Sequence, residues 1–269
     1  MVLSLRDVAQ RCLDVTGRIS VNNDVFGYIF RDTDGSMFGS LQAGDILPGT
    51  NSATGRSLRR LLQTINGRAF DLVPIFVGHE NDFSGTFSRD DATKVQYAIQ
   101  VARDIYAQQN LGIRRIIWWR ISEAHVGGYA DIANRAEALN LTSDHSGPPG
   151  GIDGFFVQSI TGAAGWSHAP GPGPCEPGPC DKHASNDDLT GAVIEVSNSR
   201  RFTGILVGHE VGHYLGLLTG TSPTNLMGVD QMPPGGDGID ELSNASTGLT
   251  AAQGTCMRGH CSVSVCSPA

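Results

Sequence analysis

The amino-acid sequence predicts an α/β fold with a mixed, mostly parallel and twisted sheet. The first reason is a strand–helix–strand pattern: the apolar run DLVPIFV at 71–77, a long amphipathic segment at 88–112 and a second apolar run at 113–122. Such a unit crosses over right-handed and leaves its two strands parallel. The second reason is that two more runs typical of buried strands follow, IDGFFVQSI at 152–160 and GAVIEV at 191–196.

The first 68 residues are predicted to form an accessory or pro-like segment ahead of a main domain at 69–269. Residues 4–14 have a helical pattern, 24–30 read as a strand, and SLRRLLQTINGR at 57–68 has the pattern of a second helix that Gly67 ends. This segment has few side chains suited to chemistry. We therefore expect the function to lie in the main domain.

Within the main domain, the segment at 88–112 is expected to be a long helix that backs the sheet. A short helix is predicted near 130–140, and residues 161–190 are so rich in Pro and Gly that they are predicted to be loop. Apolar residues follow one stripe of a helix predicted at 200–216, and a capping box from Thr250 to Gln253 opens a closing helix.

Charge and hydropathy exclude several kinds of partner. The chain of 269 residues has 19 basic and 27 acidic side chains and a formal net charge of −8, so it has no basic field for nucleic acid or an anionic membrane. No apolar run is long enough to span a bilayer, and the first residues lack the apolar core of a signal peptide. The sequence therefore predicts a soluble chain.

Six cysteines predict an oxidising compartment, and secretion is the setting we expect. Cys175 and Cys180 are close enough in sequence to bridge a small loop. The pairing among Cys256, Cys261 and Cys266 does not follow from the sequence.

The segment HEVGH at 209–213 has the spacing of a zinc site. On a helix, His209 and His213 stand one turn apart on one face, so both imidazoles can reach one zinc ion. Glu210 lies beside them, where a carboxylate can take a proton from a metal-activated water. The alternative is that these are three polar residues on a half-buried helix. A second pair, His79 and Glu80, lacks a second histidine and is not predicted to be a site.

The segment HEVGHYLG, followed by TNLMG at 224–228, resembles the metzincin clan of zinc metallopeptidases. The resemblance implies that His209 and His213 bind zinc, that Glu210 is the general base and that Gly216 turns the chain back toward the metal. It also implies that Met227 is the hydrophobic floor of the site.

Residues 152–196 resemble the strands that lead to the active-site helix in metzincins of the pappalysin and cytophagalysin type. This resemblance implies an edge strand near 165–168 that rims the cleft and pairs with an extended peptide. Trp118, Trp119 and Trp166 are expected in the core or in the wall of the cleft, and Trp166 is the only one of the three that is a candidate for contact with substrate. The fold implied is α/β with a backing helix, an active-site helix and a C-terminal helix.

The chain departs from the metzincin pattern at Thr219, where the third ligand is usually histidine. A neutral hydroxyl is a poor zinc ligand, so three explanations stay open. Thr219 binds through water, the site is catalytically inactive, or the third ligand comes from elsewhere. The nearest alternative donor is Asp230, and the more remote ones are His183, Asp237, Glu241 and His260.

The function predicted from the sequence is a zinc-dependent metalloendopeptidase that acts on proteins or peptides with Glu210 as general base. The alternative is an inactive, metzincin-like protein that binds peptides. Acidic turns at 32–36 and 235–242 resemble calcium sites but fall short of a complete loop, so solvated turns are the simpler interpretation. Cys12 is a candidate latency switch, although a buried structural cysteine explains it more simply.

Overall fold

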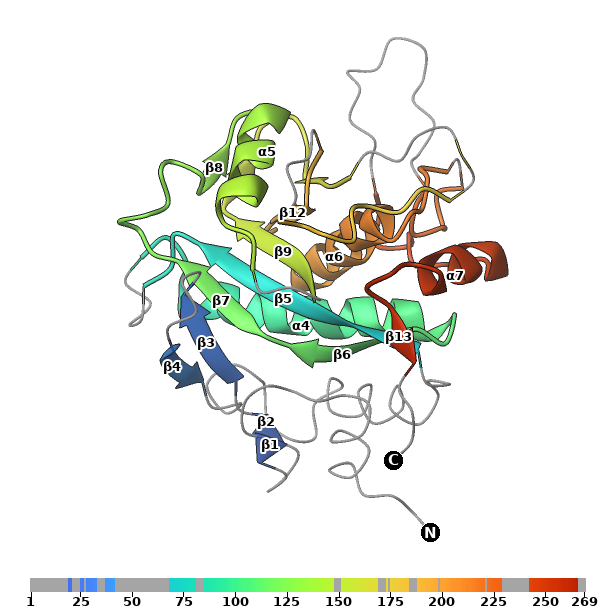
Figure 1. Ribbon diagram of the computed structural model, residues 1–269, viewed down its shortest axis with the longest axis horizontal. Coiled ribbons are helices and arrows are strands. Elements are labelled where there is room, and N and C mark those ends of the chain that lie inside the picture. The colour runs from blue at the N-terminus through green and yellow to red at the C-terminus, as the bar shows by residue number, and fades with distance from the viewer. Residues whose placement is uncertain are drawn as a thin grey trace.

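The structure of the chain is a computed structural model, and Figure 1 shows the arrangement of its elements. The described residues are 19–20, 25–26, 28–32, 37–41, 68–80, 85–147, 151–168, 173, 175–183, 188–197, 199–220, 222–228 and 242–265. The helix predicted at 4–14 lies outside these residues, as do Cys12, Asp230 and the helix predicted at 57–68 apart from Arg68, which begins a strand. The described helices are α4 (Arg89–Ala107), α5 (Arg135–Asp144), α6 (Arg200–Tyr214) and α7 (Ala251–Arg258).

A mixed sheet runs through the centre of the molecule, with parallel strands in its middle and antiparallel strands at both ends (Figure 1). The pairs β12–β9, β9–β5, β5–β7 and β7–β3 are parallel, whereas β11–β12 and β3–β4 are antiparallel. This confirms the predicted α/β fold with a mixed, mostly parallel sheet. In spatial order the strands are β11 (Gly165–Trp166), β12 (Gly191–Glu195), β9 (Gly151–Val157), β5 (Arg68–Val77), β7 (Trp118–Ile121), β3 (Tyr28–Asp32) and β4 (Met37–Leu41).

The single strand predicted at 113–122 is wrong, because the structure has two strands there. Strands β6 (Gly112–Ile116) and β7 both run parallel to β5, with a break at Ile117. The pairs Leu72–Ile116 and Ile75–Trp119 place this break opposite Val73 and Pro74. Pro74 has no N–H to donate to a neighbouring strand, and this lost donor accounts for the interruption.

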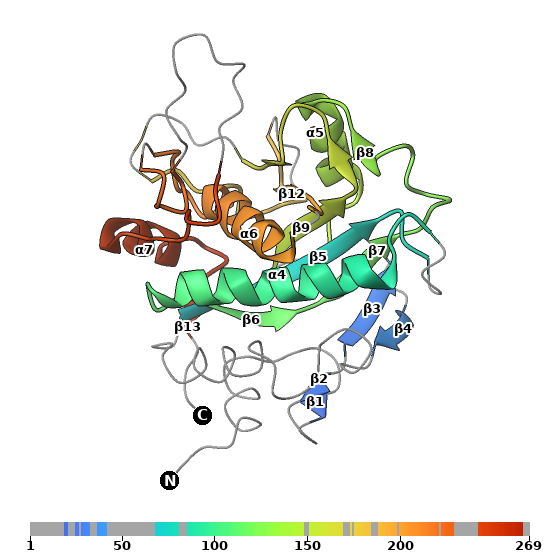
Figure 2. The same ribbon diagram turned by 180° about the vertical axis from the view of Figure 1, so that it is seen from behind.

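Helices cover both faces of the sheet. Helices α4 and α6 pack together on one face, and Figure 2 shows them side by side from behind. Helix α5 packs on the opposite face through Ala138 and Leu141. Strand β5 is buried on both faces because its alternate residues enter the two cores, which is typical of a parallel central strand.

The backing helix α4 begins at the predicted position but ends at Ala107, before the predicted end at residue 112, which belongs to β6. Ser88 caps its N-terminus, and the side chains of Ser88 and Asp91 form a reciprocal capping box. Close approach of α4 to α6 requires a small residue, since a Cβ placed on Gly204 would lie 2.5 Å from the Val101 side chain. The buried Tyr106 hydroxyl donates to the carbonyl of Gly208 at 2.7 Å, so α4 also fixes the helix that carries the histidines.

The helix predicted near 130–140 begins later than expected. Residues 131–132 form a short strand, and Asn134 then caps α5 by accepting a hydrogen bond from the N–H of Glu137 at 3.1 Å. The predicted loop at 161–190 contains no described helix, and the closing helix α7 has the predicted capping box of Thr250 and Gln253. The remaining short strands are β1 (Ile19–Ser20), β2 (Val25–Phe26), β8 (Asp131–Ile132), β10 (Ser159–Ile160) and β13 (Ser264–Val265).

The described parts of the first 68 residues are short strands. Strand β3 pairs in parallel with β7, and β4 continues the sheet from β3. The strand predicted at 24–30 corresponds to β2 and β3. Whether this segment is an accessory unit stays a prediction.

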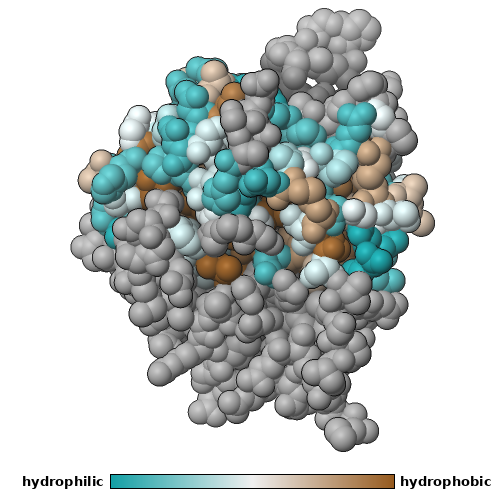
Figure 3. Space-filling view, viewed as in Figure 1, coloured by the Kyte–Doolittle hydropathy of each residue, from teal (hydrophilic) through white to brown (hydrophobic). Residues whose placement is uncertain are grey.

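The described surface is mixed in character. On the face seen in Figure 3, hydrophilic side chains separate smaller hydrophobic groups. Among the described residues, no helix is both long and apolar enough to cross a lipid bilayer.

Candidate metal centre

Helix α6 carries the HEVGH segment and places its two histidines on one face. Ser199 caps the helix by accepting a hydrogen bond from the N–H of Phe202 at 3.2 Å. The helix ends at Tyr214, and Gly216 follows with φ +98°, a backbone conformation that favours glycine. The chain therefore turns sharply just after His213.

The imidazoles of His209 and His213 converge. Their Nε2 atoms lie 3.1 Å apart, and the rings are nearly perpendicular, with centroids 4.6 Å apart. Two nitrogen ligands of one tetrahedral zinc ion lie about 3.3 Å apart at the usual zinc–nitrogen distance. The spacing of the two nitrogens therefore fits a shared zinc ion.

A hydrogen bond at the Nδ1 atom of each ring fixes the tautomer of that ring. His209 Nδ1 lies 2.8 Å from the carbonyl oxygen of Leu226, and His213 Nδ1 lies 2.8 Å from that of Leu217. A carbonyl oxygen only accepts hydrogen bonds, so each Nδ1 carries the proton and donates it. In the neutral rings both Nε2 atoms then present lone pairs to each other. This is the arrangement of zinc-binding histidines that are oriented by their surroundings.

Burial keeps both rings neutral. It lowers the pKa of His209, although the bond to Leu226 opposes the shift. Burial, followed by the neighbouring His209, lowers the pKa of His213 to about 4. Neutral imidazole is the form that binds a metal, so the site needs no proton loss at neutral pH.

Glu210 lies between the helix and the edge strand β11. Its side chain is buried, and a Cβ placed on Gly165 would lie 2.5 Å from its Oε1 atom. Burial raises the pKa of Glu210 to about 8, and within the described part of the chain its carboxyl has no ion-pair partner. A cation held by the adjacent imidazoles would favour the carboxylate.

Met227 lies against the histidine helix. The residue is fully buried, and a Cβ placed on Gly212 would lie 2.9 Å from its Sδ atom. The loop around Met227 is tied down by two backbone bonds, from Gly220 N–H to the Met227 carbonyl at 2.6 Å and from Leu226 N–H to the Gly248 carbonyl at 2.7 Å. The second bond fixes the residue whose carbonyl orients His209.

No third ligand accompanies the pair among the residues that the structure covers. Thr219 is exposed, and the described residues include no group of three His, Cys, Asp or Glu side chains arranged to hold one ion. His183 is exposed, and His260 is buried with its ring against Tyr214, so neither joins the pair. Three of the donors considered from the sequence lie outside the described ranges, namely Asp230, Asp237 and Glu241.

The strand implied near 165–168 is β11, at the end of the sheet beside β12. Gly165 pairs with Ile194 and Trp166 with Val193, in antiparallel register. Trp166 is half-buried, in contrast to Trp118 and Trp119, which lie in the core as predicted. The position of β11 against Glu210 makes it the described sheet edge next to the histidine pair.

Sequence reasoning missed an ion-pair cluster that follows β11. His168 Nδ1 lies 2.6 Å from Asp188 Oδ2, and Arg135 of α5 pairs with the same carboxylate. These three residues are far apart in the sequence and share no motif. The cluster anchors the chain just beyond the edge strand.

The predicted loop closure between Cys175 and Cys180 is wrong. Cys175 pairs with Cys256, and Cys180 pairs with Cys261, at Cα–Cα distances of 5.7 and 5.9 Å. Both bonds span 81 positions, so the segment after β11 is fastened to α7 and the turn that follows it. Cys175 and Cys180 are separated by the same number of residues as Cys256 and Cys261. This equal spacing is the signal that could have revealed the pairing.

The remaining predictions concern side chains near the site. The Tyr214 hydroxyl donates to the carbonyl of Pro179 at 2.8 Å, so this tyrosine packs against the segment that contains Pro179. Glu80 of the His79–Glu80 pair forms a 3.0 Å ion pair with Arg120. The two acidic turns considered for calcium lie almost entirely outside the described residues.

No protein-family model matches this chain, and no curated protein matches it in sequence. The conclusion about function therefore depends on the arrangement around His209, Glu210 and His213.

Proposed function

We propose that the chain is a zinc-dependent metallopeptidase of the metzincin type, which hydrolyses peptide bonds in proteins or peptides. One observation carries this proposal. Two imidazoles, one buried and one half-buried, direct their unprotonated Nε2 atoms at a common point, each ring is held by a carbonyl, and a buried carboxyl follows the first histidine in the helix. Such an arrangement has little purpose in a core that holds no cation.

His209 and His213 would hold the zinc ion, and one or more further donors would complete its coordination. Zinc supplies Lewis acidity and lowers the pKa of a water molecule toward neutrality. Glu210 would accept the proton of the attacking water and return it to the leaving amine. Its burial excludes bulk water from this proton transfer.

An extended peptide is the substrate that the site would accept. Strand β11 ends the sheet, so its outer backbone groups are available to pair with an added strand. The close approach of Gly165 to Glu210 would bring the backbone of such a peptide next to the general base. Two disulfides are typical of an oxidising compartment, and secretion is part of the proposal.

The test is cleavage of casein by purified, zinc-loaded protein. Activity should disappear on chelation, return with zinc and be lost in Glu210→Gln, while that variant keeps its zinc. Glu137→Gln is the matched control, because Glu137 caps α5 on the opposite face of the sheet. A wild-type protein that binds no zinc, or cleavage that survives in Glu210→Gln, would refute the proposal.

The competing function is a peptide-binding protein without catalysis. The exposed side chain at Thr219 and the lack of a third donor among the described residues favour this alternative. It predicts tight binding of extended peptides without turnover, even when zinc is in excess. Measuring affinity and cleavage on the same peptide separates the two functions.

The identity of the third ligand is a separate question. From its distance in sequence, Asp230 is the first donor to test, by measuring the zinc content of Asp230→Ala. Loss of zinc would support Asp230 as a ligand. Stoichiometric zinc in this variant would leave Thr219, acting through water, as the next residue to change.

A further inference from the structure

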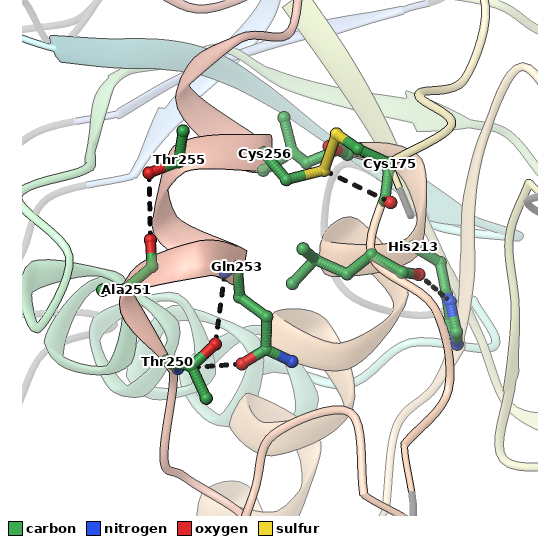
Figure 4. The surroundings of a disulfide bond; sticks show 10 residues. Cys175, His213, Thr250, Ala251, Gln253, Thr255 and Cys256 are labelled. Carbon is green, nitrogen blue, oxygen red and sulfur yellow. Dashed lines mark hydrogen bonds between the residues drawn. A yellow bond between two sulfur atoms is a disulfide. The ribbon is translucent and has the colours of Figure 1, made fainter. Parts of the chain in front are cut away.

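We propose that residues 175–179, here called the strap, are a positioning element for His213, and that zinc affinity depends on the Cys175–Cys256 disulfide more than on Cys180–Cys261. This inference rests on the proposed zinc site. It follows from where each disulfide lies relative to the end of α6. Figure 4 shows the Cys175–Cys256 bond beside the helix end that carries His213.

The strap is hydrogen-bonded along the last turn of α6. The N–H of Gly178 donates to the carbonyl of Tyr214 at 2.8 Å, and the N–H of Glu176 donates to that of Gly216 at 3.3 Å. In return, the Tyr214 hydroxyl donates to the carbonyl of Pro179 at 2.8 Å. The strap therefore satisfies carbonyl groups that the end of a helix leaves without partners.

The disulfide covers the turn at Gly216. The Sγ atom of Cys256 lies 3.4 Å from the Gly216 carbonyl oxygen and 3.7 Å from that of Leu215. A Cβ placed on Gly216 would lie 3.0 Å from Pro177 N and 3.1 Å from this Sγ. Strap and disulfide thus enclose the residue at which the chain reverses.

This turn sets the acceptor that orients His213. Leu217 directly follows Gly216, and its carbonyl accepts the hydrogen bond from His213 Nδ1 at 2.8 Å. Movement of Gly216 would displace that carbonyl and release the ring. A ligand that loses its orienting partner binds metal more weakly, by about 10- to 100-fold.

The second disulfide provides a matched control. Both bonds have the same sequence separation of 81, so their effects on the entropy of the unfolded chain are equal in the loop-closure model. They differ in what they contact. Cys261 lies near His260, 3.7 Å from its Nδ1, whereas Cys256 contacts the turn after His213.

The experiment compares Cys175→Ser/Cys256→Ser with Cys180→Ser/Cys261→Ser in the full chain. Zinc affinity is measured by competition with a chelating dye, and folding by circular dichroism and thermal melting. We expect similar melting temperatures for the two variants, and a zinc affinity about 10- to 100-fold weaker only in the first. Equal zinc affinities in the two variants would overturn the proposal.

A variant that keeps both disulfides tests the role of the strap without the risk that loss of a disulfide prevents folding. In Gly178→Ala, the added Cβ would lie 2.9 Å from the Tyr214 ring, so the strap has to move away from α6. We expect weaker zinc binding in a folded protein, and wild-type affinity would overturn the proposal. Wild-type protein that binds no zinc would instead refute the proposed function, so the two failures are distinguishable.

Discussion

His209 and His213 face each other through unprotonated nitrogens 3.1 Å apart, because each ring donates its only proton to a main-chain carbonyl. The carbonyls belong to Leu226 and Leu217, both in the segment between α6 and α7. This segment therefore orients both imidazoles. A cation between the two nitrogens would replace the repulsion of their lone pairs by attraction.

The first prediction is that zinc stabilises the folded chain. At 100 times its dissociation constant, zinc should add about 2.7 kcal/mol to the free energy of unfolding. Thermal melting with and without zinc measures this shift, which should vanish in His209→Ala and in His213→Ala. His125→Ala is the control, because His125 is exposed and bonded to Ser122. Equal shifts in all variants would place the bound zinc elsewhere.

The second prediction concerns Gly165. A Cβ at this position would lie 2.5 to 2.7 Å from the side chain of Glu210, so Gly165→Ala has to displace the proposed general base. We expect a marked loss of peptidase activity with an unchanged melting temperature. Gly154→Ala is the matched control in the same sheet, since its nearest neighbours lie at 3.7 Å or more. Full activity in Gly165→Ala would contradict the placement of Glu210.

The third prediction concerns Met227, which packs against the histidine helix. Met227 is fully buried, so Met227→Ala should lower the free energy of unfolding by about 2 to 5 kcal/mol through the cavity it leaves. Met227→Leu conserves volume and should cost less than about 1.5 kcal/mol. Denaturant titration of the metal-free protein measures both variants. Equal costs for the two would show that the side chain does not support the helix by packing.

Much of the fold followed from local patterns. The buried strand at 71–77, the long helix after Ser88 and the histidine helix were predicted because their apolar patterns are encoded within short segments. The break at Ile117 was not predicted, because it depends on Pro74 in a different strand. An apolar run in the sequence does not reveal which other strand will lie next to it in the sheet.

The candidate site divides in the same way. His209, Glu210 and His213 could be found because four-residue spacing on a helix brings the two rings together. The partners that orient them could not, since the carbonyls of Leu217 and Leu226 carry no side-chain signal. The disulfide pairing was missed because proximity in sequence was taken as a guide to partners. The cysteines of each disulfide are instead 81 positions apart.

The fourth prediction concerns a buried ion pair between Lys182 and Asp153 of strand β9. Lys182 Nζ lies 2.5 Å from Asp153 Oδ1 and 3.0 Å from the Gly151 carbonyl, and both side chains are buried. Lys182→Met leaves the Asp153 carboxylate without its cation and should cost about 3 to 5 kcal/mol of unfolding free energy. The double variant Lys182→Met/Asp153→Asn should recover part of this loss. If it recovers none, the pair stabilises the fold by packing and not by charge.

The fifth prediction is a pH dependence at the start of α4. Burial acts to raise the pKa of the Asp91 carboxyl, but hydrogen bonds from Ser88 and Lys94 outweigh it, and the pKa lies below its ordinary value of 3.8. The carboxylate therefore stabilises the folded state above this value, and that contribution is lost as the pH falls through the lowered pKa. At neutral pH, Asp91→Asn should reduce the free energy of unfolding by about 1 kcal/mol, and the gap to wild type should narrow in acid. Denaturant titration across the acidic range measures this gap.

Asp90→Asn is the control, because Asp90 is an exposed neighbour that also pairs with Lys94, and it should show a smaller effect. A difference between Asp91→Asn and wild type that widens in acid would contradict the capping role of Asp91.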